Sequence, residues 1–148
     1  GHRLLVAGQG PARQRVASLA RAQRKIEYLG WVPHSRLYGL LQRVKTFWMP
    51  SIWAEPFGIA GVEAMAHGVP VIATPRGGIT EWLKHGEFGV FLEPNHPEIL
   101  AEIASNLASD QQRLTRMSTS ARNFVERKFS HERCASDLIE IYNKISHD

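Results

Sequence analysis

Short apolar runs alternate with helical patterns along the whole chain, and this alternation limits the possible folds more than any other feature. The runs expected to form strands are residues 4–7, 26–29, 46–49, 69–73 and 90–92. Between them, apolar residues recur at helical spacing, as in Leu37, Leu40, Leu41 and Val44. Such alternation is typical of a parallel sheet covered by helices on both faces. The sequence therefore predicts an α/β fold, a three-layer sandwich with a mostly parallel sheet.

Several helix ends are also marked in the sequence. An Ala-rich helix over residues 59–66 is expected to stop at His67-Gly68, because glycine commonly follows the last helical residue. Pro97 suits a first helical turn, and Ser35 and Ser130 are candidate N-caps. The apolar face of the expected last helix carries Cys134, Leu138, Ile141 and Ile145.

Length and composition place the chain among single globular domains. It has 148 residues, 43% of them hydrophobic and 22% charged, which suits one core and excludes a disordered chain. Gly and Pro interrupt every uncharged run well before the roughly twenty residues that a membrane span needs. The single Cys134 allows no intrachain disulfide, and the apolar stretch after Arg3 is too short for a secretory signal. We therefore expect a cytoplasmic protein.

The chain is basic, with 18 Lys and Arg against 14 Asp and Glu, a net charge of +4. This balance suits nucleic acid, a phosphorylated small molecule or an anionic membrane surface. The basic residues are scattered over helical segments, and no strand interleaves aromatic and basic residues as a base-stacking surface requires. Nucleic acid is therefore not expected as a partner, whereas peripheral association with a membrane surface stays open.

Two glutamates, Glu55 and Glu63, flank the start of the helix expected at residues 59–66. The amides and the dipole of a helix start attract an anion such as a phosphate, and Gly58 lets the backbone approach it closely. Ionised carboxylates only accept hydrogen bonds, so they suit the hydroxyls of a sugar or a ribose. One carboxylate on each side of a phosphate site suits a nucleotide sugar.

Each glutamate also has an ordinary structural explanation. A loop Glu followed by Pro is commonly exposed, and a Glu in an Ala-rich helix is commonly a good helix former on the solvent side. Glu63 differs because no other charged residue shares its expected helix, where its burial would be costly without a partner.

An ordered set of further motifs accompanies the two glutamates. It comprises Val6-Ala7-Gly8-Gln9-Gly10-Pro11, Leu29-Gly30-Trp31-Val32, Pro50-Ser51, Glu55-Pro56-Phe57-Gly58, Glu63-Ala64-Met65-Ala66, Gly68-Val69-Pro70-Val71, Gly77-Gly78 with Glu81, and Phe129-Ser130-His131-Glu132-Arg133. With these motifs the chain resembles the retaining glycosyltransferases of the GT-B fold (group 1, family 4), whose two glutamates have seven residues between them. The resemblance implies one nucleotide-sugar-binding domain over residues 1–148, the Rossmann-like C-terminal half of such an enzyme.

The resemblance also implies roles for residues around the two glutamates. Glu63 would bind the ribose hydroxyls of the nucleotide. Glu55 would bind a hydroxyl of the transferred sugar, which makes it the catalytic candidate. The backbone amides of Phe57, Gly58 and Ile59 would bind the sugar and the diphosphate.

Four residues nearer the amino terminus complete the implied site. Trp31 and Val32 would lie beside the base of the nucleotide. Gly8 and Gly10, in the turn after the first expected strand, are candidate binding residues, although such a turn is equally common without a ligand.

The implied reaction transfers a hexose from a nucleotide-diphosphate sugar to an acceptor hydroxyl with retention, in polysaccharide, glycolipid or glycoconjugate synthesis. It needs no obligatory metal and no other cofactor. Family members hold the diphosphate with an Arg and a Lys after the first strand of this domain, and no such strand and basic pair precede Leu4. The acceptor-binding N-terminal domain is the expected partner, so we expect this chain alone to be inactive. The base of the donor, uridine, guanosine or adenosine, stays open.

Three other functions are weighed against this interpretation. A retaining glycoside hydrolase holds its two carboxylates about 5 Å apart, whereas a helix start separates these two. A nucleotide-sugar epimerase can share the architecture but lacks this glutamate pair. A non-catalytic module that binds a nucleotide sugar, or packs against a partner, is the main alternative.

Overall fold

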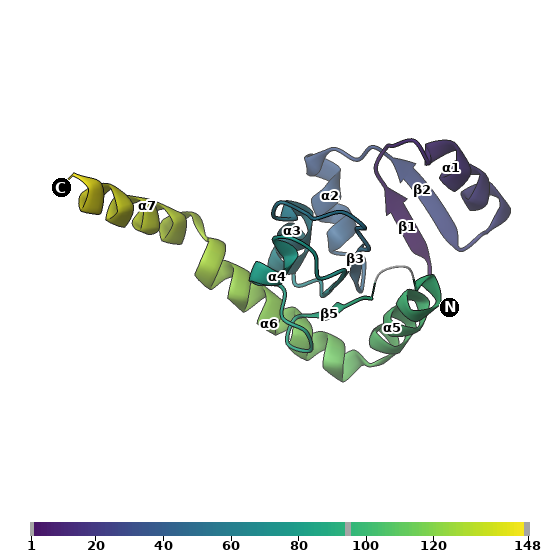
Figure 1. The fold of residues 1–148 in the computed structure, drawn as a ribbon. Coiled ribbons are helices and arrows are strands. Elements are labelled where there is room, and N and C mark those ends of the chain that lie inside the picture. The colour runs from purple at the N-terminus through teal and green to yellow at the C-terminus, as the bar shows by residue number, and fades with distance from the viewer. Residues whose placement is uncertain (1, 94–95, 147–148) are drawn as a thin grey trace. The chain divides into compact units, whose positions relative to one another are not determined.

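The computed structural model describes residues 2–93 and 96–146. The chain folds as two compact units, residues 1–43 and 44–148, each built from parallel strands and helices (Figure 1). The predicted α/β class is confirmed. The strands form two sheets, of two and three strands, where we expected one. Among the described strands, none hydrogen-bonds to strands of both sheets.

The first unit is a two-stranded parallel sheet with two helices. Its elements are β1 (Leu4–Ala7), α1 (Arg13–Ala22), β2 (Ile26–Gly30) and α2 (His34–Leu41). Leu4 lies opposite Ile26 and Ala7 opposite Gly30 in the register of the pair. Since the strands are parallel, their carboxyl ends lie at the same edge of the sheet.

The start of α2 differs from the prediction that Ser35 is its N-cap. The N-cap is Pro33, whose extended backbone (ψ 152°) precedes the helix and whose side chain makes no capping hydrogen bond. The Pro33 carbonyl accepts hydrogen bonds from the amides of Arg36 and Leu37. The proline ring preorganises this start, so the helix begins earlier and Ser35 lies within its first turn.

The second unit holds a three-stranded parallel sheet in the order β3-β4-β5. Its elements are β3 (Phe47–Met49), α3 (Ile59–Ala66), β4 (Val71–Ala73), α4 (Ile79–Trp82), β5 (Gly89–Phe91), α5 (Pro97–Ser109), α6 (Gln111–Phe129) and α7 (His131–Ile145). The predicted bounds of α3 are confirmed. Gly68 follows α3 with a φ of +71°, the left-handed backbone that favours glycine after a helix.

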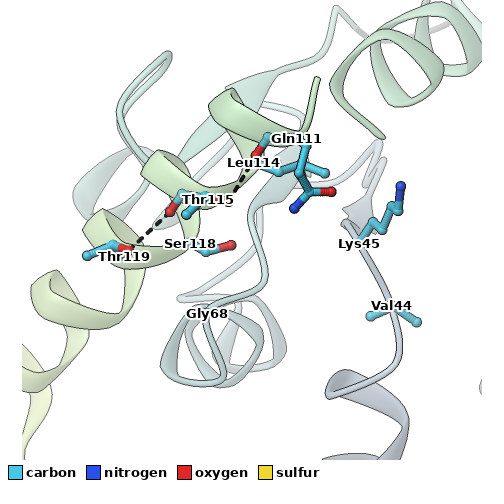
Figure 2. A pocket seen from close by; sticks show the side chains of 8 residues that line it. All are labelled: Val44, Lys45, Gly68, Gln111, Leu114, Thr115, Ser118 and Thr119. Atoms are coloured by element: carbon cyan, nitrogen blue, oxygen red, sulfur yellow. Dashed lines mark hydrogen bonds between the residues drawn. The ribbon is translucent and has the colours of Figure 1, made fainter. Parts of the chain in front are cut away.

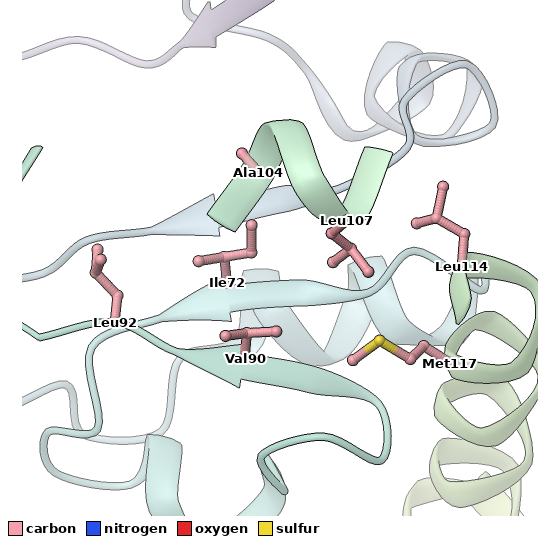
Figure 3. Packing of buried hydrophobic residues seen from close by; sticks show 7 residues of the cluster. All are labelled: Ile72, Val90, Leu92, Ala104, Leu107, Leu114 and Met117. Carbon is pink, nitrogen blue, oxygen red and sulfur yellow. The ribbon is translucent and has the colours of Figure 1, made fainter. Parts of the chain in front are cut away.

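The hydrophobic core of the second unit joins its sheet to α5 and α6. Seven buried side chains form it, from β4, β5 and the residue that follows, α5 and α6 (Figure 3): Ile72, Val90, Leu92, Ala104, Leu107, Leu114 and Met117. All three residues of β4 are fully buried, as a continuous apolar strand predicts. Trp48 of β3 packs against this core, one residue before the strand ends and the loop to α3 begins.

Asp110 joins α5 to α6 and caps the second of these helices. Its carboxylate accepts a hydrogen bond of 2.8 Å from the amide of Arg113. We expect Asp110→Ala to lower the free energy of unfolding by about 1 kcal/mol, because the cap is lost. Asp110→Asn keeps a capping oxygen and serves as the control in thermal unfolding followed by circular dichroism. Equal melting temperatures for the two variants would show that the cap contributes nothing.

The last helix, α7, begins as predicted, but its apolar face is uncovered. Ser130 caps it by accepting a hydrogen bond of 3.2 Å from the amide of Arg133. Hydrogen bonds from its own backbone amide and from the Ser130 side chain lower the pKa of Glu132. None of the residues of α7 is buried, and Ile141 and Ile145 are 53% and 69% exposed. The amphipathic pattern is therefore present without a partner surface in the described chain.

Candidate functional site

The backbone at the start of α3 needs a glycine. Gly58, the N-cap, has φ +80° and ψ 48°, a left-handed conformation that costs glycine little. A Cβ on Gly58 would also lie 3.2 Å from Cε of Met49 and 3.3 Å from Cζ2 of Trp82. No side chain caps this helix. The first amides of a helix have no acceptor one turn back. In α3 the Gly61 amide donates to the Gly58 carbonyl at 2.9 Å, which leaves the amides of Ile59 and Ala60 for a bound anion.

Glu55 is held beside this helix start by a hydroxyl and by two glycines. It is half-buried, and the Ser51 hydroxyl donates a hydrogen bond of 2.6 Å to its Oε1. The amide of Gly78 donates to the Glu55 carbonyl at 2.8 Å. A Cβ on Gly77 would overlap that same carbonyl, and the φ of Gly77 is +59°. The backbone of Glu55 is thus fixed from one side, while a carboxylate oxygen is oriented from the other.

Glu63 lies one turn into α3, half-buried beside the fully buried Ala64 and Met65. Glu63 takes part in an interaction within the chain. Four positions separate it from Ile59, so both residues lie on the same face of the helix. Ile59 is 65% exposed. This face of α3 is therefore the accessible one, and it carries two of the predicted site residues.

Exposed apolar side chains border the loop that leads into α3. Ile52 and Trp53 are 73% and 57% exposed. The guanidinium of Arg76 donates a hydrogen bond of 2.9 Å to the Ile52 carbonyl and so fixes this part of the loop. Phe57 is half-buried, and its ring meets that of Phe129 edge to face, with 5.6 Å between the centroids.

The four predicted residues nearer the amino terminus lie in the first unit, at the carboxyl ends of its strands. The Gly8 amide donates to the Gly30 carbonyl at 2.7 Å, which brings the residues after β1 and β2 together. Trp31 is 66% exposed and Val32 is half-buried. Gly10 accepts a hydrogen bond from the amide that begins α1. The structure therefore gathers Gly8, Trp31 and Val32 at one sheet edge.

Trp82 belongs to the site, although sequence reasoning missed it. Its indole Nε1–H donates a hydrogen bond of 2.5 Å to the carbonyl of Phe57, and its side chain is 1% exposed. The signal that could have indicated a bulky neighbour is Gly61, because a glycine inside a helix commonly marks a close approach. A Cβ on Gly61 would overlap the Trp82 ring.

A separate shallow pocket lies near the other end of α3, between Gly68, which follows the helix, and α6 (Figure 2). It is lined by Val44, Lys45, Gly68, Gln111, Leu114, Thr115, Ser118 and Thr119. The hydroxyls of Thr115 and Thr119 donate to carbonyls of their own helix, and the Lys45 ammonium donates to the Ala108 carbonyl. These polar groups are satisfied within the chain, so the pocket does not compete with the start of α3 as the candidate site.

Two absences hold for the part of the chain that the structure describes. No three described His, Cys, Asp or Glu side chains lie close enough together to hold a metal ion. That no metal is needed stays a prediction. None of the described helices combines the length and apolar character needed to cross a membrane.

Comparisons with known proteins identify the family of the chain. The family model for glycosyl transferases group 1 matches residues 2–124. A glycosyltransferase of Methanocaldococcus jannaschii, itself uncharacterized, is 30% identical over 143 residues, which cover 95% of this chain and 36% of the relative. A glycogen synthase of Mycobacterium tuberculosis is 28% identical over 145 residues, with coverages of 96% and 35%. The chain thus spans about a third of the length of these curated relatives.

A solved structure shares the fold. HepE from Anabaena, crystallised in complex with UDP and glucose, matches with a TM-score of 0.83 and 23% identity, over 96% of this chain and 40% of that one. The likeness confirms the predicted fold, that of the Rossmann-like C-terminal half of GT-B glycosyltransferases. Because the family model covers most of its residues, the chain belongs to the glycosyl transferases group 1 family.

Proposed function

We propose that this chain is the donor-binding domain of a retaining glycosyltransferase that transfers a hexose from a nucleotide-diphosphate sugar to an acceptor hydroxyl. The observation that carries the proposal is the start of α3, where an N-terminus without a side-chain cap follows a left-handed Gly58 and lies between Glu55 and Glu63. An uncapped helix start binds a diphosphate through its amides and its dipole. The flanking carboxylates accept hydrogen bonds from hydroxyls on either side of that diphosphate.

The proposed roles divide the donor among these groups. Glu63 accepts from the ribose hydroxyls, and Glu55, oriented by the Ser51 hydroxyl, accepts from a hydroxyl of the transferred sugar. The amides of Phe57, Gly58 and Ile59 bind the sugar and the diphosphate. In the transfer itself, the amides stabilise the charge that develops on the leaving diphosphate. That diphosphate takes the proton of the acceptor hydroxyl on the same face of the sugar, which gives retention without an obligatory metal.

The relatives suggest where to begin with the donor and the partner. HepE binds UDP and glucose in its crystal structure, so a uridine nucleotide is the first donor to test. Since the chain covers about a third of its curated relatives, we propose that an acceptor-binding domain completes the enzyme. Trp31 and Val32 are the proposed neighbours of the base. The cytoplasmic location, association with a membrane surface and the absence of a nucleic-acid partner stay predictions.

Calorimetric titration of the chain with UDP-, GDP- and ADP-glucose tests the proposal. We expect one of these donors to bind, and Glu63→Ala to weaken binding by about tenfold or more, because hydrogen bonds to a charged acceptor are lost. Glu102→Ala, which removes an exposed carboxylate from α5, is the matched control and is expected to bind as the native chain does. Equal binding by all three proteins, or no binding to the folded native chain, would refute the proposal.

The alternative of a non-catalytic module is tested with the same sample. Release of free sugar from the donor by the chain alone would show that catalysis does not need a second domain. Binding without release agrees with both a donor-binding domain and a module. Transfer on addition of an acceptor-binding domain from a group 1 relative then separates these two possibilities.

A further inference from the structure

One short segment anchors the loop before α3 at two successive points. The Gly78 amide donates a hydrogen bond of 2.8 Å to the Glu55 carbonyl. Four residues later, the indole N–H of Trp82 donates a hydrogen bond of 2.5 Å to the Phe57 carbonyl. Both anchors belong to residues 77–82, the turn and the short helix α4. The conformation of residues 55–57 is therefore set by groups that are distant in sequence.

The second anchor determines where one amide of the helix start points. The Phe57 carbonyl and the Gly58 N–H belong to the same peptide group, which is planar and trans. In such a group the C=O and N–H bonds point in opposite directions. A carbonyl directed at the buried Trp82 indole therefore turns the Gly58 N–H away from the indole.

The indole ring also fixes how closely the start of α3 approaches α4. Its Cζ2 atom is 3.3 Å from the place where a Cβ of Gly58 would lie and 3.0 Å from that of Gly61. The ring thus contacts the helix backbone at the N-cap and again three residues later. Because protein interiors are closely packed, a smaller side chain at this position would leave the helix start room to shift.

We propose that Trp82 is a positioning residue for the diphosphate of the donor: it orients the Gly58 amide through the Phe57 carbonyl. The inference rests on the proposed function of the α3 start and adds a residue that touches no part of the donor. It predicts that loss of the indole N–H lowers the affinity for a ligand whose phosphate reaches the Gly58 amide. The affinity for a ligand whose phosphate does not reach this amide should stay nearly unchanged.

Binding of nucleoside diphosphates and monophosphates by Trp82→Phe is the test. The native chain is titrated with UDP, GDP and ADP, and then with the monophosphate of whichever base binds. For Trp82→Phe we expect the affinity for the diphosphate to fall about tenfold and that for the monophosphate to stay within about twofold. In 1H–15N NMR spectra of the free protein, the Gly58 amide signal is expected to shift.

A control variant separates this role from general destabilisation. Leu107→Ala removes buried volume from the core around β4 and β5, a cluster that includes no residue of α3, and we expect it to leave the ratio of the two affinities unchanged. If Trp82→Phe weakens both nucleotides equally, or leaves the diphosphate affinity intact, Trp82 does not position the amide. If the native chain binds its diphosphate but Trp82→Phe has the same ratio of diphosphate to monophosphate affinity, only this inference is overturned. A native chain that binds no nucleotide overturns the proposed function with it.

Discussion

Gly78→Ala is expected to lower the free energy of unfolding by about 3 kcal/mol, because the new methyl group has no space. Gly78 is buried, and a Cβ there would overlap the Pro56 carbonyl oxygen and lie 2.9 Å from Cα of Phe57. These neighbours are backbone atoms, so relief requires the whole loop to move. For a chain of this size the melting temperature should fall by roughly 6–12 °C. Donor binding should fall with it, since Glu55 moves with the loop.

Gly39→Ala is the matched control for this substitution. Gly39 lies inside α2, and a Cβ there would meet nothing within 4 Å. Alanine at an open helical position stabilises by about 0.5–1 kcal/mol relative to glycine. The same chemical change should therefore have opposite signs at the two sites in thermal unfolding followed by circular dichroism. Equal melting temperatures would mean that the turn at residues 77–78 is not tightly packed.

Met117→Ala is expected to cost about 2–5 kcal/mol, through lost burial and the cavity left behind. Met117 is 1% exposed and belongs to the core between the sheet, α5 and α6. Urea unfolding monitored by tryptophan fluorescence measures the change, since Trp48 packs against this core.

Leu138→Ala in α7 provides the comparison for the core variant. Leu138 is 57% exposed, so removal of its side chain leaves no cavity in the described chain. We expect a change of less than about 0.5 kcal/mol, as for surface positions in general. A similar loss for both variants would contradict the exposed state of α7.

Much of the fold could be predicted because its signals are local. β1 begins and ends where the apolar run 4–7 does, and α3 has its predicted bounds because Gly58 and Gly68 delimit it. Ser130 caps α7 as expected, since a serine before a helix has an amide three residues ahead within its reach. At Ser35 the same kind of signal was wrong, because Pro33 starts the helix first.

The site was predictable only in part because its supports are distant in sequence. The residues around Glu55 and Glu63 were indicated by their order along the chain, but the hydrogen bond from the Ser51 hydroxyl to Glu55 was not predicted. Trp82 acts on Phe57 from 25 positions away, and no periodicity links the two. The apolar face of α7 was visible in the sequence, but whether a helical face is covered depends on what lies opposite it.

The exposed face of α7 gives the second unit a gradient of local stability. A helix of 15 residues that buries no side chain is held mainly by its own backbone hydrogen bonds, and isolated helices of this length are marginal in water. Its amides therefore open without unfolding of the core and exchange with solvent faster than those of β4. The C-terminal segment is accordingly where a protease would first gain access to the second unit, until another surface covers Ile141 and Ile145.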